Sequence, residues 1–192
     1  MILEFITVVG RKRLLDQKLT EGQAMDTSTD RFGKIHRERK NKRRFIIWAV
    51  LPDITVKIVS AQETGLTAEE YIACVGQSAL GPTRPLSNTE RVQAYLDNSN
   101  LTVSARNDSG VLLGVFRGTT DWNWVCYCAD LAVVEAQQGQ GIGQALMDKA
   151  AEILGPGVAI TLLSLPGAEG FYQKIGLTQT NAAFYRDRTH RT

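Results

Sequence analysis

The hydrophobic pattern of this chain becomes regular at about residue 54, where short strand-like runs begin to alternate with helical stretches. Ile54–Val59 alternates apolar and polar residues, which is typical of a half-buried strand. Residues 158–163 are almost entirely apolar, so we expect that strand to be buried on both faces. The predicted strands are 54–59, 101–106, 111–119, 125–134, 158–163 and about 182–187.

Capping and glycine signals bound four predicted helices. Thr67 and Ser87 are each followed three residues later by Glu, and this capping-box spacing predicts a helix start at both residues. We expect the first helix to stop at Gly81-Pro82 and the second to close near Asn98. The other two helices are predicted at 142–154 and 168–175, each followed by a glycine.

The order of these elements, β-α-α-β-β-β-α-β-α-β, indicates the fold class. A polar Asn-Asp-Ser-Gly turn at 107–110 joins two strands into a hairpin. The helix at 142–154 connects two strands that can therefore run parallel. The sequence predicts a mixed α/β fold, with a single central mixed sheet and flanking helices.

Charge divides the chain at about residue 53. Residues 1–53 hold 12 Lys and Arg against 7 Asp and Glu, whereas residues 54–192 hold 10 against 13. Residues 34–44 include seven of these basic residues, which indicates either a nucleic-acid or targeting patch or a solvated, disordered tail. A translated upstream extension is a third possibility, with the working protein starting near residue 50. No aromatic residue interrupts the run, so we expect no nucleic-acid partner and a poorly ordered basic extension.

Composition excludes several function classes. No apolar run approaches the ~20 residues of a membrane span, and Met1–Val9 lacks the flanks of a signal peptide. Three cysteines suit a reducing compartment, so we expect buried thiols and a cytoplasmic protein. Only two histidines are present, His36 and His190, both near the ends of the chain. A histidine-based triad or zinc site in the core is therefore not expected, and we predict no metal.

A glycine-rich bend, Gln138–Gly143, lies between the strand 125–134 and the helix 142–154. Glycine allows a sharp turn and a close approach of the backbone to a ligand. The free N–H groups of the first helical turn favour an anion, so we expect this bend to hold a pyrophosphate. The spacing fits neither a phosphate loop ending in Gly-Lys-Ser/Thr nor the G-x-G-x-x-G/A dinucleotide fingerprint.

The bend instead resembles the coenzyme A loop of the GNAT superfamily of acyl-CoA N-acyltransferases. Gln138, Gly141 and Gly143 match its Q-x-x-G-x-G pattern. Residues 170–177 are similar to a second landmark of that family, although they end in Leu177 where Phe is usual. The resemblance covers roughly residues 54–190. It implies a V-shaped cleft between the strands 125–134 and 158–163, with acetyl-CoA as co-substrate and no metal.

The resemblance also implies roles for individual residues. Leu131 and Val133 would pair their backbone with the pantetheine amides, as an added strand does. Tyr172 would protonate the leaving thiolate, or it is a core aromatic residue. The expected cofactor-binding residues are Leu131, Ala132, Val133, Gln138, Gly139, Gln140, Gly141, Ile142 and Gly143.

Asp130 is a charged residue inside an apolar strand. An unpaired buried carboxylate is costly, so Asp130 must face the cleft or be paired. In the cleft it would accept the amine proton through a water or attract a cationic substrate. In a structural role it would cap a loop or pair with an arginine such as Arg117. Asp121, Trp122, Trp124 and Tyr127 either line an acceptor pocket or belong to the core and rim.

The predicted function is transfer of an acetyl group from acetyl-CoA to a primary amine, by direct attack in a ternary complex. The acceptor is an amine-bearing small molecule or protein, and a homodimer is compatible with the sequence. Two alternatives stay open: a non-catalytic acyl-CoA-binding module, and a nucleic-acid-binding protein that acts through residues 34–44.

Overall fold

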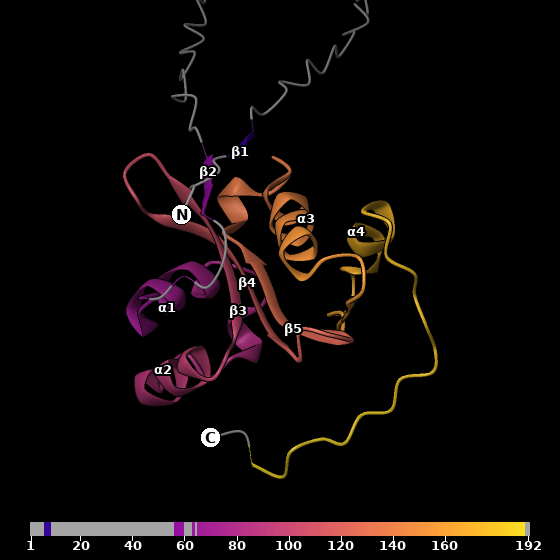
Figure 1. Ribbon diagram of the computed structural model, residues 1–192. Coiled ribbons are helices and arrows are strands. Elements are labelled where there is room, and N and C mark those ends of the chain that lie inside the picture. Colours follow the sequence, from indigo (N-terminus) through magenta and orange to yellow (C-terminus); the bar gives the residue numbers. More distant parts are fainter. Residues whose placement is uncertain (1–5, 9–55, 60–62, 64, 191–192) are drawn as a thin grey trace, which may run out of the picture. The chain divides into compact units, whose positions relative to one another are not determined.

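The computed structural model describes residues 6–8, 56–59, 63 and 65–190 (Figure 1). The strands are β1 (Ile6–Val8), β2 (Val56–Val59), β3 (Leu101–Asn107), β4 (Leu112–Thr120), β5 (Val125–Val133) and β6 (Ala159–Thr161). The α-helices are α1 (Ala68–Gly76), α2 (Thr89–Asp97), α3 (Ile142–Leu154) and α4 (Glu169–Lys174), and two 3₁₀ turns, η1 and η2, cover Gly81–Thr83 and Glu135–Gln137.

The six described strands form one sheet in the order β1-β2-β3-β4-β5-β6. Every neighbouring pair is antiparallel except β5 and β6, which are parallel and are joined by α3. The predicted mixed α/β class with a single mixed sheet and flanking helices is confirmed.

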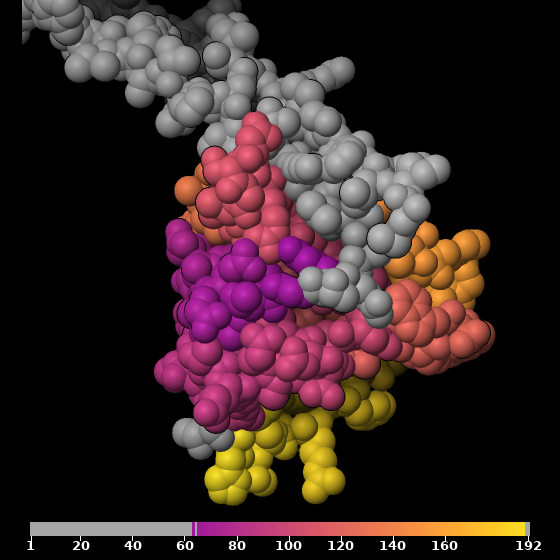
Figure 2. Space-filling view, turned by 60° about the vertical axis from the view of Figure 1, so that its left-hand side comes forward, coloured from indigo at the N-terminus to yellow at the C-terminus, as the bar shows by residue number. Residues whose placement is uncertain are grey.

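Helices cover both faces of the sheet, α1 and α2 on one and α3 and α4 on the other (Figure 1). On the first face, Tyr71, Val75 and Val92 pack against Val115 of β4. On the second face, Leu146 and Ala150 of α3 pack against Phe116 of β4. Figure 2 shows α1 and α2 covering the first face as a continuous layer. The three cysteines are buried and free, as predicted.

Capping groups begin the first two helices, though the second differs from the prediction. Thr67 caps α1 with the full capping box to Glu70, as expected. In α2 the cap is Asn88, whose side-chain oxygen accepts from the N–H of Arg91 at 2.9 Å. The prediction of Ser87 as the cap was therefore wrong by one residue. Asn and Ser cap about equally well, so the spacing to Glu90 alone did not identify the cap.

Three other expectations were wrong. The first helix ends at Gly76 rather than at Gly81-Pro82, and residues 81–83 form the separate turn η1. Strand β6 is not buried on both faces, because its central residue is half-buried and its two ends are exposed. The segment 182–187 is not a strand: it pairs with none of the described strands, and Phe184 is 99% exposed.

Residues 9–53 lie outside the described residues, and so does the basic run 34–44. The boundary at residue 53 and the roles considered for that run therefore stay predictions. Within residues 1–53, the structure describes Ile6–Val8, which pairs with β2. No helix in the described part of the chain has both the length and the apolar character needed to cross a bilayer.

Two alanine substitutions test which residue caps α2. We expect Asn88→Ala to lower the free energy of unfolding by about 1 kcal/mol, because the Arg91 N–H loses its acceptor. Ser87→Ala is the matched control and should change it by less than about 0.5 kcal/mol. Urea unfolding followed by circular dichroism measures both values, and a larger loss for Ser87→Ala would contradict the structure.

Candidate active site

Strand β5 continues beyond its partner β6. The two strands pair only at Val125, Cys126 and Tyr127, although β5 extends to Val133. The register with β4 shifts after Cys128, since Gly118 faces Cys128 whereas Arg117 faces Asp130. Ala129 is thus the extra residue of a β-bulge, placed where β5 leaves β6.

The edge of β5 that faces away from β4 is available beyond the bulge. Antiparallel strands direct the N–H and C=O groups of alternate residues to the partner strand. The N–H of Val134 donates to Leu113 O on the β4 side, so Leu131 and Val133 direct their backbone groups to the other edge. The Val133 carbonyl accepts from Gln138 Nε2 at 3.1 Å. No described residue bonds the N–H and C=O of Leu131 on this edge.

The glycine bend between β5 and α3 carries a row of free backbone donors. Gly139 and Gly141 have φ values of +77° and +85°, a left-handed conformation that favours glycine. Gln138 N donates to Glu135 O and Ala145 N donates to Gly141 O. Between these two bonds, the N–H groups of residues 139–144 have no acceptor among the described residues. Six such groups at the start of a 13-residue helix form a cradle for an anion.

Gly143 is needed for packing rather than for its backbone angles. A Cβ at this position would lie 3.1 Å from Phe171 Cζ, closer than an ordinary contact, so glycine lets the Phe171 ring lie against the first turn of α3 without a shift. The Phe171 ring thus contacts this turn and the Tyr172 ring, although 37% of Phe171 is exposed.

Four of the expected cofactor-binding residues have side chains that are either buried or hydrogen-bonded within the protein. Ala132 and Ile142 are 2% exposed and belong to the two cores. Gln138 uses its amide on Val133 O, and Gln140 Nε2 donates to Gln137 Oε1 at 2.9 Å. Of these four, only Gln140 and Ile142 add a free backbone N–H to the bend.

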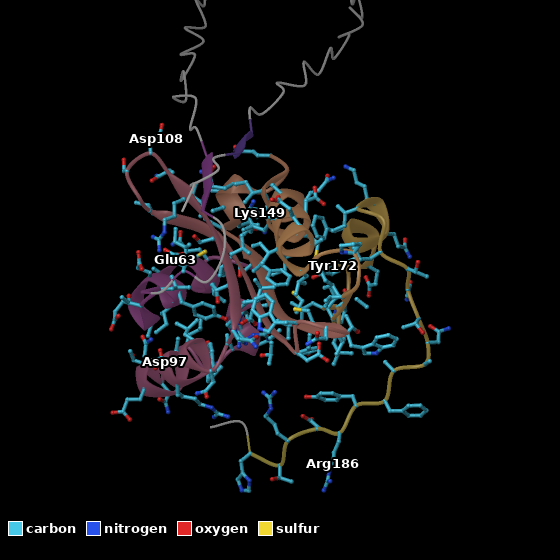
Figure 3. The ribbon with its side chains drawn as sticks, in the orientation of Figure 1. Glu63, Asp97, Asp108, Lys149, Tyr172 and Arg186 are labelled. Atoms are coloured by element: carbon cyan, nitrogen blue, oxygen red, sulfur yellow. The ribbon has the colours of Figure 1, made fainter. Side chains whose placement is uncertain are left out.

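Tyr172 lies on the side of α4 that faces the sheet (Figure 3). It is half-buried, and its phenol makes no hydrogen bond with a described residue. Burial raises the pKa of Tyr172 to about 12; Cys128 on β5 adds to this shift and the charge of Arg84 opposes it. Tyr172 is therefore a protonated phenol within electrostatic reach of the bulge of β5.

Asp130 is completely buried and is paired on both oxygens. Oδ1 accepts from Arg84 Nε at 2.6 Å, and Oδ2 accepts from Arg117 Nε at 2.5 Å and from the Tyr71 hydroxyl at 2.7 Å. Burial alone would raise the pKa of Asp130, but the charges of Arg117 and Arg84 outweigh it and hold this pKa below its ordinary value. A carboxylate bound in this way is a poor proton acceptor, and the structural alternative of a pair with Arg117 is the one observed.

Arg84 is a site residue that sequence reasoning missed. Beside its bond to Asp130, its Nη2 donates to the carbonyl of the bulged residue Ala129 at 2.8 Å. Its side chain is 22% exposed. The only sequence signal is its position between Pro82 and Pro85, in a segment with no helical or strand pattern. Proline restricts such a loop, so the arginine is presented from a rigid segment.

The tip of the β4–β5 hairpin is held by Asp121. Its Oδ1 accepts from the N–H groups of Asn123, Trp124 and Val125, and this turn keeps Trp122 at φ 64°. Trp124 is 76% exposed, so it belongs to neither core. Asp121 therefore has a structural role. Tyr127, another of the four residues considered for an acceptor pocket, lies near enough to Arg84 for that charge to act on its phenol.

No group of three or more His, Cys, Asp or Glu side chains in the described part of the chain is arranged to hold a metal ion. The groups that the site offers are the backbone donors of the bend, Tyr172 and the arginine–carboxylate cluster.

Comparison with known proteins gives a family and a fold. The sequence model of the acetyltransferase (GNAT) family matches residues 69–177. No curated protein sequence matches the chain.

Solved structures with similar folds include three acetyltransferases. A putative acetyltransferase from Deinococcus radiodurans R1 is 24% identical, with a TM-score of 0.56, covering 68% of this chain and 87% of that one. A GNAT family protein from Streptococcus pneumoniae TIGR4 is 22% identical, with a TM-score of 0.54 and coverages of 70% and 98%. The N-acetyltransferase YhbS from Escherichia coli, in complex with CoA, is 22% identical, with a TM-score of 0.50 and coverages of 66% and 70%.

Replacing Asp130 by Asn tests the buried cluster. We expect a loss of about 3–5 kcal/mol at pH 7, because two largely buried guanidinium groups, 22% and 12% exposed, lose their counter-charge. The folded pKa of Asp130 lies below the 3.8 of a free carboxyl, so its contribution is complete above about pH 4 and is lost as the pH falls further.

The difference in unfolding free energy between wild type and Asp130→Asn should therefore shrink from pH 7 to pH 3, as measured by urea unfolding. Asp108→Asn, on the exposed hairpin turn, is the matched control and should stay near wild type at both values. An Asp130→Asn protein as stable as wild type at pH 7 would contradict the account.

Proposed function

We propose, because this chain belongs to the acetyltransferase (GNAT) family, that it transfers the acetyl group of acetyl-CoA to a primary amine. Membership of the family makes the chain a GNAT-type N-acetyltransferase. What we propose in addition is the identity of the acyl donor and the mechanism. The acceptor is an amine-bearing small molecule or protein that attacks directly in a ternary complex.

The observation that carries this proposal is the row of unpaired N–H groups at residues 139–144. Four of these six residues, 139–141 and 144, are exposed, so their donors are open to a ligand from solvent. The left-handed glycines Gly139 and Gly141 flank Gln140 in this bend, which lies at the positive end of the α3 dipole. A pyrophosphate is the part of acetyl-CoA that suits such a site.

The pantetheine arm suits the free edge of β5. Leu131 offers an N–H and a C=O on this edge, so an amide of the arm can bond there as an added strand does. The acetyl thioester then reaches the bulge at Ala129, where Tyr172 lies within electrostatic range.

The reaction at this point requires one bond to form and one to break. The neutral amine attacks the thioester carbonyl, a C–N bond forms, and a backbone N–H near Leu131 stabilises the oxyanion. The C–S bond then breaks, and Tyr172 donates its proton to the leaving thiolate. The proton lost by the amine passes to water, because both oxygens of Asp130 are bound to Arg84, Arg117 and Tyr71.

We assign this catalysis to a domain spanning residues 54–192, and we regard residues 1–53 as a basic extension that contributes β1. The three free thiols favour a cytoplasmic location. We propose no nucleic-acid partner.

Tyr172→Phe separates binding from turnover. We expect kcat to fall by about 100-fold, because the phenol is replaced by a ring with no proton to donate. The dissociation constant of acetyl-CoA, measured by calorimetry, should stay within about twofold of wild type, because the bend and β5 are untouched. Thiol release with a panel of primary amines gives the rate.

Tyr185→Phe is the control, since Tyr185 is an exposed tyrosine on the C-terminal segment, and its kcat should match wild type. Unchanged turnover in Tyr172→Phe would remove Tyr172 as the acid. A protein that binds no acetyl-CoA would refute the proposed function itself.

A further inference from the structure

The cluster of Arg84, Arg117 and Asp130 has a net charge of +1, because two guanidinium groups face one carboxylate. Arg84 and Arg117 both pair with this carboxylate, and no other described carboxylate lies within 4 Å of either guanidinium. Their side chains are only 22% and 12% exposed, so solvent screens the excess charge weakly. Such an excess favours the binding of an anionic group.

Arg84 is the part of the cluster that a ligand can reach. It carries the larger exposed fraction and bonds to the carbonyl of Ala129, the bulged residue at which β5 leaves β6. Burial raises the pKa of the Tyr127 and Tyr172 phenols, and the charge of Arg84 opposes this rise at both. Arg84 therefore lies beside the place where the acetyl group is transferred.

The guanidinium of Arg84 keeps donors free. It has five N–H groups, of which three are used, on Asp130 Oδ1, Thr83 Oγ1 and Ala129 O. These three bonds fix the plane of the guanidinium, so the remaining two N–H groups are presented in a set direction. Arginine N–H groups held in this way bind carboxylates strongly.

Arg117 is less suited to this role. Its Nε bonds to Asp130, its Nη1 bonds to Ser99 Oγ, and its guanidinium lies 4.5 Å from the centre of the Tyr95 ring. Its side chain is also only 12% exposed, against 22% for Arg84, so it supplies positive charge to the cluster but is less open to a ligand.

From these observations we propose that the acceptor amine carries a carboxylate and that Arg84 binds it during the reaction. This inference rests on the proposed acetyltransferase function and narrows its acceptor to amines of the amino-acid type. Polycationic acceptors such as polyamines and aminoglycosides are disfavoured, because they would bring further positive charge to an already positive cluster.

Matched acceptor pairs test the proposal kinetically. The probes are L-phenylalanine with L-phenylalaninamide and glycine with glycinamide, each assayed by thiol release at saturating acetyl-CoA. We expect the acid-to-amide ratio of kcat/KM to fall by about tenfold or more in Arg84→Gln. Dividing the wild-type ratio by that of the variant cancels the different basicities of the two amines. Asp130 keeps Arg117 and Tyr71 as partners in this variant, so the fold should survive.

Arg186→Gln is the matched control. Arg186 lies on the C-terminal segment and points away from the strands, so its removal should leave the ratio unchanged (Figure 3). A fall in kcat of Arg84→Gln that is equal for acids and amides would overturn the proposal, because Arg84 would then act on the thioester or the fold alone. Faster turnover of spermidine than of every acid would also overturn it.

A binding measurement makes the test independent of turnover. N-acetyl-L-phenylalanine and its amide are titrated into the CoA-loaded protein by calorimetry. The proposal predicts that the acid binds at least tenfold more tightly and that Arg84→Gln abolishes the difference. Equal or undetectable binding of both would refute it, even if acetyl-CoA binds. Failure of acetyl-CoA to bind would instead refute the proposed function.

Discussion

Unused backbone hydrogen bonding is the constraint on which this site depends. A sheet normally pairs the N–H and C=O groups of its inner strands on both edges, and β5 does so only as far as Tyr127. The N–H groups of residues 139–144 are likewise left without internal partners by two left-handed glycines. Groups of this kind need a ligand or water, so the fold itself selects a partner that is extended, rich in amides and anionic at one end.

Asp130 links this backbone surface to the acceptor side. It joins β5 to the segment that carries Arg84, to α1 through Tyr71 and to β4 through Arg117. Arg84 also bonds the carbonyl of Ala129, so the same cluster fixes the bulge and presents a positive charge beside it. A residue that sequence reasoning considered as a base therefore organises the site through its pairing.

The sequence predicted the elements whose signals are local. The helix 142–154 was predicted with its observed bounds, because an amphipathic pattern lies between two glycine signals. The predicted strand at 182–187 did not form, since a strand depends on a partner edge that its own residues do not encode. For the same reason Arg84 was missed: its role comes from contacts with β5, 45 and 46 residues away in sequence.

A titration of ¹⁵N-labelled protein with CoA, followed through the backbone amide shifts, measures whether the free N–H groups of the bend and of Leu131 hold the cofactor. We expect the largest shift changes at Gly139, Gly141 and Gly143 and at Leu131, because these N–H groups gain acceptors. Binding of CoA that leaves these four amides unmoved would contradict this expectation.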